Sequence, residues 1–218
     1  MTGATRHATR LFLRAFRWPM VIAVVVLAPT LAVVAGSSQL PVCTRQYQSC
    51  DSPLWAYTPV LVGVAIAVSL AGSFPEIDQS AARHLGAYKA CYLITVVAAA
   101  ALAIVAVLVA ATALGLVVSS TPLATALVRN TLGWVGCTVL VARLFGSPLS
   151  WVGAVVATFV FEWFGRGASG TALGWAFAIA ATTESWSWVV ATSLMLAAIF
   201  MTVWGGTEAR LHFASPTG

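Results

Sequence analysis

Long apolar runs separated by short polar segments dominate this chain. No charged residue occurs in 18–44, 52–75 or 90–128. A helix rises about 1.5 Å per residue, so about 20 residues cross the hydrocarbon layer of a bilayer, which is about 30 Å thick. The first two runs therefore predict one membrane-spanning helix each, at 18–36 and 54–72.

The third run is too long for a single span. Ser119, Ser120 and Thr121 favour a turn, and Pro122 cannot continue a helical hydrogen-bond ladder. We therefore expect one helix before this break and another after it, with further helices beyond the tight turn at 143–148. The four remaining spans are predicted at 91–117, 124–145, 149–164 and 186–205.

A mostly apolar stretch at 171–183 lies before the last span, after a glycine-rich segment. Thirteen helical residues would extend only about 20 Å, too short to span a bilayer, so we expect a re-entrant or interfacial segment. The predicted fold class is all-α: a polytopic membrane protein with six transmembrane helices and a short re-entrant segment before the last. Its parts are a basic cytosolic N-terminal segment (1–17), the transmembrane domain (18–206) and a cytosolic tail (207–218).

Composition supports this prediction. The chain of 218 residues is 60% hydrophobic and only 8% charged, whereas a soluble domain carries roughly 25% charged residues. Too few charges remain to cover a water-exposed surface, which argues against a soluble enzyme.

The net charge of +5 comes mostly from four arginines before the first apolar run. They indicate a cytosolic flank in contact with anionic lipid rather than a nucleic-acid partner. A cleaved signal peptide is the alternative for this basic start, and we expect a retained helix instead.

Basic residues also predict the orientation. With the N-terminus inside, the cytosolic segments hold eight basic residues and the outer segments hold three. This bias predicts a multi-pass protein of the plasma (inner) membrane with both termini in the cytosol. The outer three are Arg45, Arg129 and Arg166.

Two cysteines, Cys43 and Cys50, lie in the first outer loop. A disulfide closing a short loop is expected if that loop faces an oxidising compartment, and two free thiols are the alternative.

Two acids lie near the outer ends of spans. Glu162 is close to the end of the fifth helix, and Glu184 just precedes the sixth. Acids at membrane depth are costly, so they line a pathway or pair with a cation, and Arg129 and Arg166 are the expected partners. Arg129 is expected to extend its guanidinium to the interface. For Glu184 we favour the simpler role of an exposed interfacial cap.

The longest cytosolic loop is predicted at 74–89. Pro75 can start a helix, Glu76 and Asp78 suit its first turn, and Arg83 lies toward its end. A short amphipathic helix here could dock a soluble partner, with Phe74 and Ile77 as apolar anchors. A solvated linker is the alternative.

Motifs for catalysis are absent from the sequence. It has no phosphate-binding loop, no His-Glu-x-x-His, no paired Cys-x-x-Cys and no Gly-x-Ser-x-Gly. We therefore expect neither catalytic residues nor a metal site in this chain.

The helix layout, with Arg129-Asn130-Thr131-Leu132-Gly133 leading to Ala142-Arg143-Leu144-Phe145-Gly146, resembles the ABC-2 type permease family, in particular its compact actinobacterial members. The resemblance implies a permease without cofactor, paired with a second copy as a homodimer or heterodimer. Separate cytosolic ATP-binding subunits would hold ATP and magnesium. The transported compound would be a lipid, peptide, antibiotic or other amphipathic molecule, and the direction of transport would be export. The residues implied in coupling to the ATPase are Phe74, Pro75, Glu76, Ile77, Asp78 and Arg83.

Two other classes of function stay open at this point. A membrane-embedded enzyme of lipid or isoprenoid chemistry would need paired acids or a histidine cluster on the inner face, where Glu76 and Asp78 are the available acids. A non-transporting accessory or assembly protein would lack a stable ATPase partner.

Overall fold

The computed structural model describes residues 18–35, 39–41, 51–70, 85–117, 121–167 and 171–204. Six α-helices make up most of these ranges, as the sequence predicts. They are α2 (Trp18–Ala35), α3 (Pro59–Leu70), α5 (Leu85–Ala113), α6 (Thr121–Phe145), α7 (Ser150–Phe164) and α8 (Ser185–Trp204). Two 3-10 helices precede α3 and α7: η1 (Leu54–Tyr57) and η2 (Ser147–Leu149).

Five of these helical stretches are long and apolar enough to cross a membrane, and they identify the chain as a membrane protein. The sixth stretch, Leu54–Leu70, which joins η1 and α3, is apolar but shorter, with 17 residues. Large apolar side chains cover much of the outer surface, for example Leu102 at 72% exposure and Leu196 at 66%. Such a surface is suited to lipid and unsuited to water.

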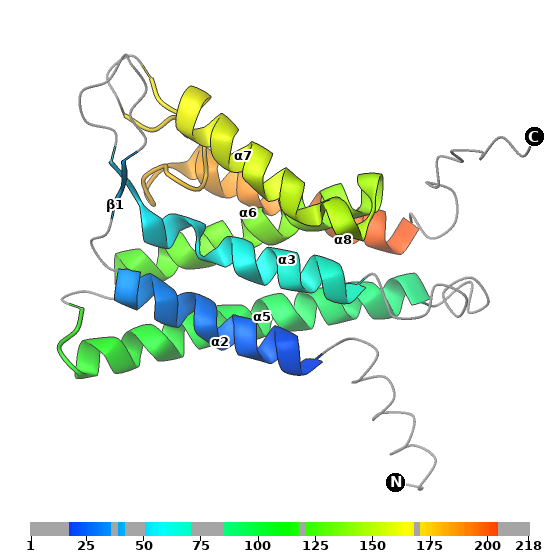
Figure 1. The fold of residues 1–218 in the computed structure, drawn as a ribbon, viewed down its shortest axis with the longest axis horizontal. Coiled ribbons are helices and arrows are strands. Elements are labelled where there is room, and N and C mark those ends of the chain that lie inside the picture. Colours follow the sequence, from blue (N-terminus) through cyan, green and yellow to red (C-terminus); the bar gives the residue numbers. More distant parts are fainter. Residues whose placement is uncertain are drawn as a thin grey trace, which may run out of the picture.

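Each helix runs antiparallel to the one before it in the chain (Figure 1). Consequently α2 begins (Trp18) and α8 ends (Trp204) at the same end of the bundle, which we call the terminal end. At the opposite end, the hairpin end, lie β1 (Gln39–Pro41), β2 (Asp51–Pro53) and the chain before α8.

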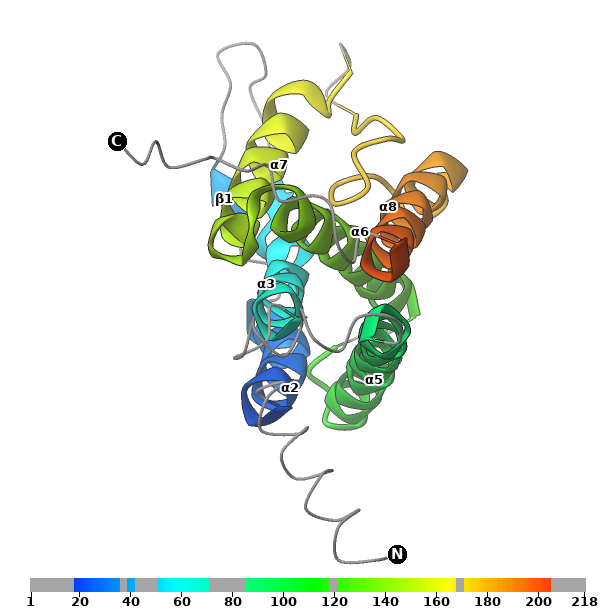
Figure 2. The same ribbon diagram turned by 90° about the vertical axis from the view of Figure 1, so that its right-hand side faces the viewer.

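The central helix is α6, which packs against α3, α5, α7 and α8 (Figure 2). Glycines allow the closest of these approaches. A Cβ atom on Gly136 would lie 2.6 Å from the carbonyl carbon of Leu194 in α8, and one on Gly63 of α3 would lie 2.9 Å from the carbonyl oxygen of Trp134. Small residues thus bring α3 and α8 close to the backbone of α6, as is common between membrane helices.

The second predicted span, 54–72, is divided at Thr58 into η1 and α3. Three further corrections concern other elements. First, α5 extends over Leu85–Ala113 and not over 91–117, so the last five residues of the predicted loop 74–89 belong to a long helix, where Lys89 is buried. Second, α6 begins at Thr121 and not at 124, because Pro122 is tolerated in a first helical turn.

Third, the all-α prediction missed the antiparallel pair β1–β2, in which Leu40 faces Ser52 in register. Three-residue strands are too short to show the alternating pattern from which strands are predicted.

The turn segment, 171–184, is a series of turns rather than a helix. Its middle residues Ala176, Phe177 and Ala178 are buried, so this irregular stretch is folded into the bundle. Leu173 N–H donates to the carbonyl of Gly165, which ties the segment to the end of α7.

Candidate functional site at the hairpin end

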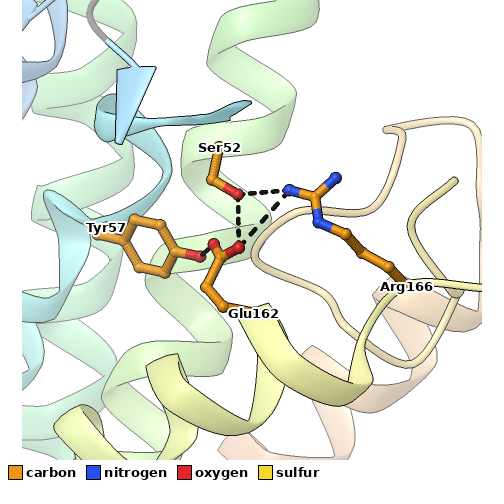
Figure 3. A network of polar contacts seen from close by, with 4 residues as sticks. All are labelled: Ser52, Tyr57, Glu162 and Arg166. Atoms are coloured by element: carbon orange, nitrogen blue, oxygen red, sulfur yellow. Dashed lines mark hydrogen bonds and ion pairs between the residues drawn. The ribbon is translucent and has the colours of Figure 1, made fainter. Parts of the chain in front are cut away.

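A buried carboxylate lies at the last turn of α7. Glu162, only 5% exposed, accepts a hydrogen bond from the Ser52 hydroxyl at 2.7 Å on one oxygen and a hydrogen bond from the Tyr57 hydroxyl on the other. Arg166 Nη2 lies 3.6 Å from the first oxygen and donates to Ser52 Oγ at 2.5 Å. Figure 3 shows these four side chains converging; we call them the acid cluster.

The acid cluster joins parts of the chain that are far apart in sequence. Ser52 belongs to β2 and Tyr57 to η1, whereas Glu162 lies in the last turn of α7 and Arg166 follows two residues after the end of that helix. The side chains of the ion pair are 12% and 3% exposed, so the pair is protected from the solvent screening that weakens surface salt bridges. The cluster therefore fastens the hairpin and the start of α3 to α7.

A second polar group surrounds Arg129, a fully buried residue in the third turn of α6. Its guanidinium donates to the carbonyl oxygens of Ala180 and Ala181 and to Ser187 Oγ, each at 2.9 Å, and to Asn130 Oδ1 at 3.2 Å. We call these contacts the carbonyl clamp. The expectation that Arg129 extends to the membrane interface is wrong, because the turn segment folds over it and supplies its acceptors.

Asn130 and Trp134 extend the clamp along α6. Asn130 Nδ2 donates to the carbonyls of Ala178, at 3.0 Å, and Ala56, at 3.2 Å, and Trp134 Nε1 also donates to Ala56, at 3.3 Å. Irregular backbone inside a membrane protein needs partners for its carbonyl groups, since lipid offers none. Side chains of α6 supply several of these partners for η1 and for the turn segment.

Aromatic rings pack beside the two polar groups. Trp134 lies 5.6 Å from Phe161 and 5.5 Å from Phe177 between ring centroids, and those two phenylalanines are 4.9 Å apart. A side chain on Gly133 would collide with the Phe177 ring, since a Cβ there would come within 2.3 Å of it. Trp134 also packs on Tyr57 of the acid cluster, with ring centroids 6.0 Å apart, so the rings connect the two polar groups.

The four polar residues expected at the outer face thus lie in three separate places. The structure places Arg166 beside Glu162 and Arg129 in the carbonyl clamp. Glu184 is exposed directly before α8. The remaining predicted site residues lie outside the described residues: Cys43, Cys50, Phe74, Pro75, Glu76, Ile77, Asp78 and Arg83.

Sequence reasoning missed Ser52, Tyr57, Asn130, Trp134 and Ser187. For Asn130 a signal was present, because an Arg-Asn pair inside an apolar run is unusual and costly. Ser52 and Tyr57 carry no such signal, since their partner Glu162 is more than 100 positions away in the chain.

Chemically, both polar groups bind parts of the chain to one another. Their hydroxyl, carboxylate and guanidinium groups are engaged in holding the hairpin end closed around α6. Comparison of the chain with protein-family models, with curated proteins and with solved structures finds no match in any of the three.

Proposed function

We propose that this chain is the membrane-spanning permease subunit of an ABC transporter that exports an amphipathic compound and is driven by separate ATPase subunits. The observation that carries the proposal is the alternating direction of the helices, with Trp18 and Trp204 at one end of the bundle (Figure 1). This is the helix order that the resemblance to ABC-2 permeases implies.

The proposal requires Leu54–Leu70 to cross the membrane as a sixth span. Seventeen residues extend about 26 Å, a few ångströms short of the hydrocarbon layer, and local thinning of the bilayer accommodates such a mismatch at modest cost. Six crossings then place the terminal end in the cytosol and the hairpin end outside, in keeping with the basic-residue bias.

In this orientation the turn segment is a re-entrant stretch entering from the outer face. Its buried position and the carbonyl partners supplied by Arg129 and Asn130 support this assignment, because irregular backbone is tolerated at membrane depth only where protein surrounds it.

Helix α3 connects the two functional ends in the proposed mechanism. Its cytosolic end, Leu70, leads directly into the loop on which an ATPase would dock. At its other end, η1 supplies Tyr57 to the acid cluster and the Ala56 carbonyl to Asn130 and Trp134. A rigid displacement of α3 by the ATPase would therefore act on both polar groups and open the outer end.

The experiment is a charge reversal in the docking loop. In a Glu76→Lys/Asp78→Lys variant, we expect weaker association with the ATPase subunit and loss of ATP-driven export, while the protein stays folded and inserted. Glu208→Lys in the C-terminal tail is the matched control and should leave association unchanged.

Normal co-purification and normal stimulation of the ATPase by the double variant would contradict the coupling role. A wild-type chain that purifies from its own membrane without any ATPase would instead favour a non-transporting accessory protein.

A further inference from the structure

Helices α5 and α8 lie together at the terminal end and spread apart toward the hairpin end (Figure 2). The close end is fixed by Gly86 of α5, where a Cβ would lie 2.7 Å from the carbonyl oxygen of Val203 in α8. Between the diverging helices is an apolar groove of about 290 Å³ with α6 as its base. Its lining includes Val97, Ala98, Ala101, Thr131, Met195 and Ile199.

The lining of the groove is apolar. Its floor is formed by Val97, Thr131 and Met195, each under 9% exposed. Thr131 carries a hydroxyl, which donates to the carbonyl of Leu127 on its own helix at 2.7 Å. No charged side chain is among the described residues that line the groove, so a polar or charged ligand would lose its hydration without gaining a partner.

The groove lies at mid-depth in the bundle and is open to its side. Val97 and Ala101 follow the start of α5 by about 18 Å and about 24 Å at the helical rise, and α5 as a whole extends about 44 Å. Leu102 and Leu196, neighbours of the groove on α5 and α8, point outward at 72% and 66% exposure. In a bilayer, this opening faces lipid hydrocarbon.

We propose that this groove is a binding site for one hydrocarbon chain of a membrane lipid. Ala98 and Ala101 leave the space that a larger side chain would fill, and the flexible thioether of Met195 adapts to an irregular aliphatic guest. Apolar burial is what retains the chain, and its headgroup stays outside the groove. The proposal depends on the chain being embedded in a membrane and is independent of the permease role.

The test uses the full-length chain, without ATPase or nucleotide, in vesicles of phosphatidylethanolamine and phosphatidylglycerol. The probe is phosphatidylethanolamine with a diazirine halfway along one acyl chain, added as a small fraction of the lipid. After illumination, cross-linked peptides are mapped by mass spectrometry. We expect cross-links to concentrate on the peptides containing Val97, Ala101 and Met195, and to persist there as the probe is diluted.

Ala101→Phe, which fills the groove, should reduce these cross-links several-fold. Ala106→Phe, an exposed position on the same helix outside the groove, is the control and should leave them unchanged. Circular dichroism and gel filtration check that both variants fold, and Ala98→Leu replaces Ala101→Phe if that variant does not.

Three results would overturn the proposal. Labelling of the exposed face of α7, at Val155 and Val156, equal to that of the groove would indicate only the general lipid layer. Groove labelling that Ala101→Phe leaves unchanged would show that the chain lies elsewhere. Cross-links between two copies through Met195, without lipid adducts, would assign the groove to a second copy. Because no ATPase is present, a failure of the permease proposal would leave this result unaffected.

Discussion

Replacement of Arg129 by methionine probes the contact that holds the turn segment in the bundle. Methionine retains most of the side-chain length but none of the donors. Three hydrogen bonds to other elements are lost, to Ala180, Ala181 and Ser187. Two of these acceptors keep other interactions, because Ala181 also accepts from Glu184 N–H and the Ser187 hydroxyl donates to the Glu184 carbonyl. The Ala180 carbonyl loses its donor.

The size of the effect is bounded by two estimates. Interhelical hydrogen bonds in a membrane protein average about 0.6 kcal/mol, so three of them give about 2 kcal/mol. Bonds made by a charged donor are worth about 1.5 kcal/mol each, so three of them give about 4.5 kcal/mol. We therefore expect Arg129→Met to lower the free energy of unfolding by about 2 to 4.5 kcal/mol.

The assay is reversible unfolding in mixed micelles, with amide hydrogen exchange measured peptide by peptide. Exchange should accelerate most in 171–184, because the turn segment loses its anchor. Thr125→Met is the matched control: Thr125 is exposed one turn earlier on α6, bonds only within that helix, and should change stability by about 0.5 kcal/mol or less. If Arg129→Met behaves like this control in both measurements, the carbonyl clamp does not stabilise the fold.

Two further predictions concern the hairpin end. Glu162→Gln removes the charge that Arg166, Ser52 and Tyr57 surround, and should cost about 1.5 to 3 kcal/mol of unfolding free energy in the same assay; the exposed Glu184→Gln serves as control, and equal effects would refute the role of the acid cluster. Cys43 and Cys50 should be recovered as one disulfide-linked pair by non-reducing peptide mapping, since the proposed topology places them outside; two alkylated thiols would contradict that prediction.

Sequence alone was sufficient for the helices because charge and hydropathy are local properties. The apolar pattern predicts α2, α7 and α8 to within about one residue at each end, since the ends of these helices lie close to charged residues or tryptophans. It was less reliable for α5. The charge of Lys89 predicts a polar loop that ends there, but α5 already begins at Leu85 and buries Lys89.

The polar groups could not be predicted in the same way. Glu162 and Arg166 are four residues apart, and Arg166 was one of the two expected partners, with Arg129 as the other. The acceptors of Arg129, by contrast, are backbone carbonyls of Ala180 and Ala181, and every residue carries such a group. Only the fold of the turn segment determines which carbonyls face the guanidinium.

The proposed permease function depends most on whether Leu54–Leu70 crosses the membrane, because this sixth crossing determines which end of the bundle meets the ATPase. The direct measurement is labelling of introduced cysteines in intact and permeabilised cells with a membrane-impermeant maleimide, read peptide by peptide. Thr183→Cys at the hairpin end should be labelled in intact cells, whereas Ser80→Cys and Thr207→Cys should be labelled only after permeabilisation. Labelling of Ser80→Cys in intact cells would contradict the six-span topology and, with it, the proposed permease.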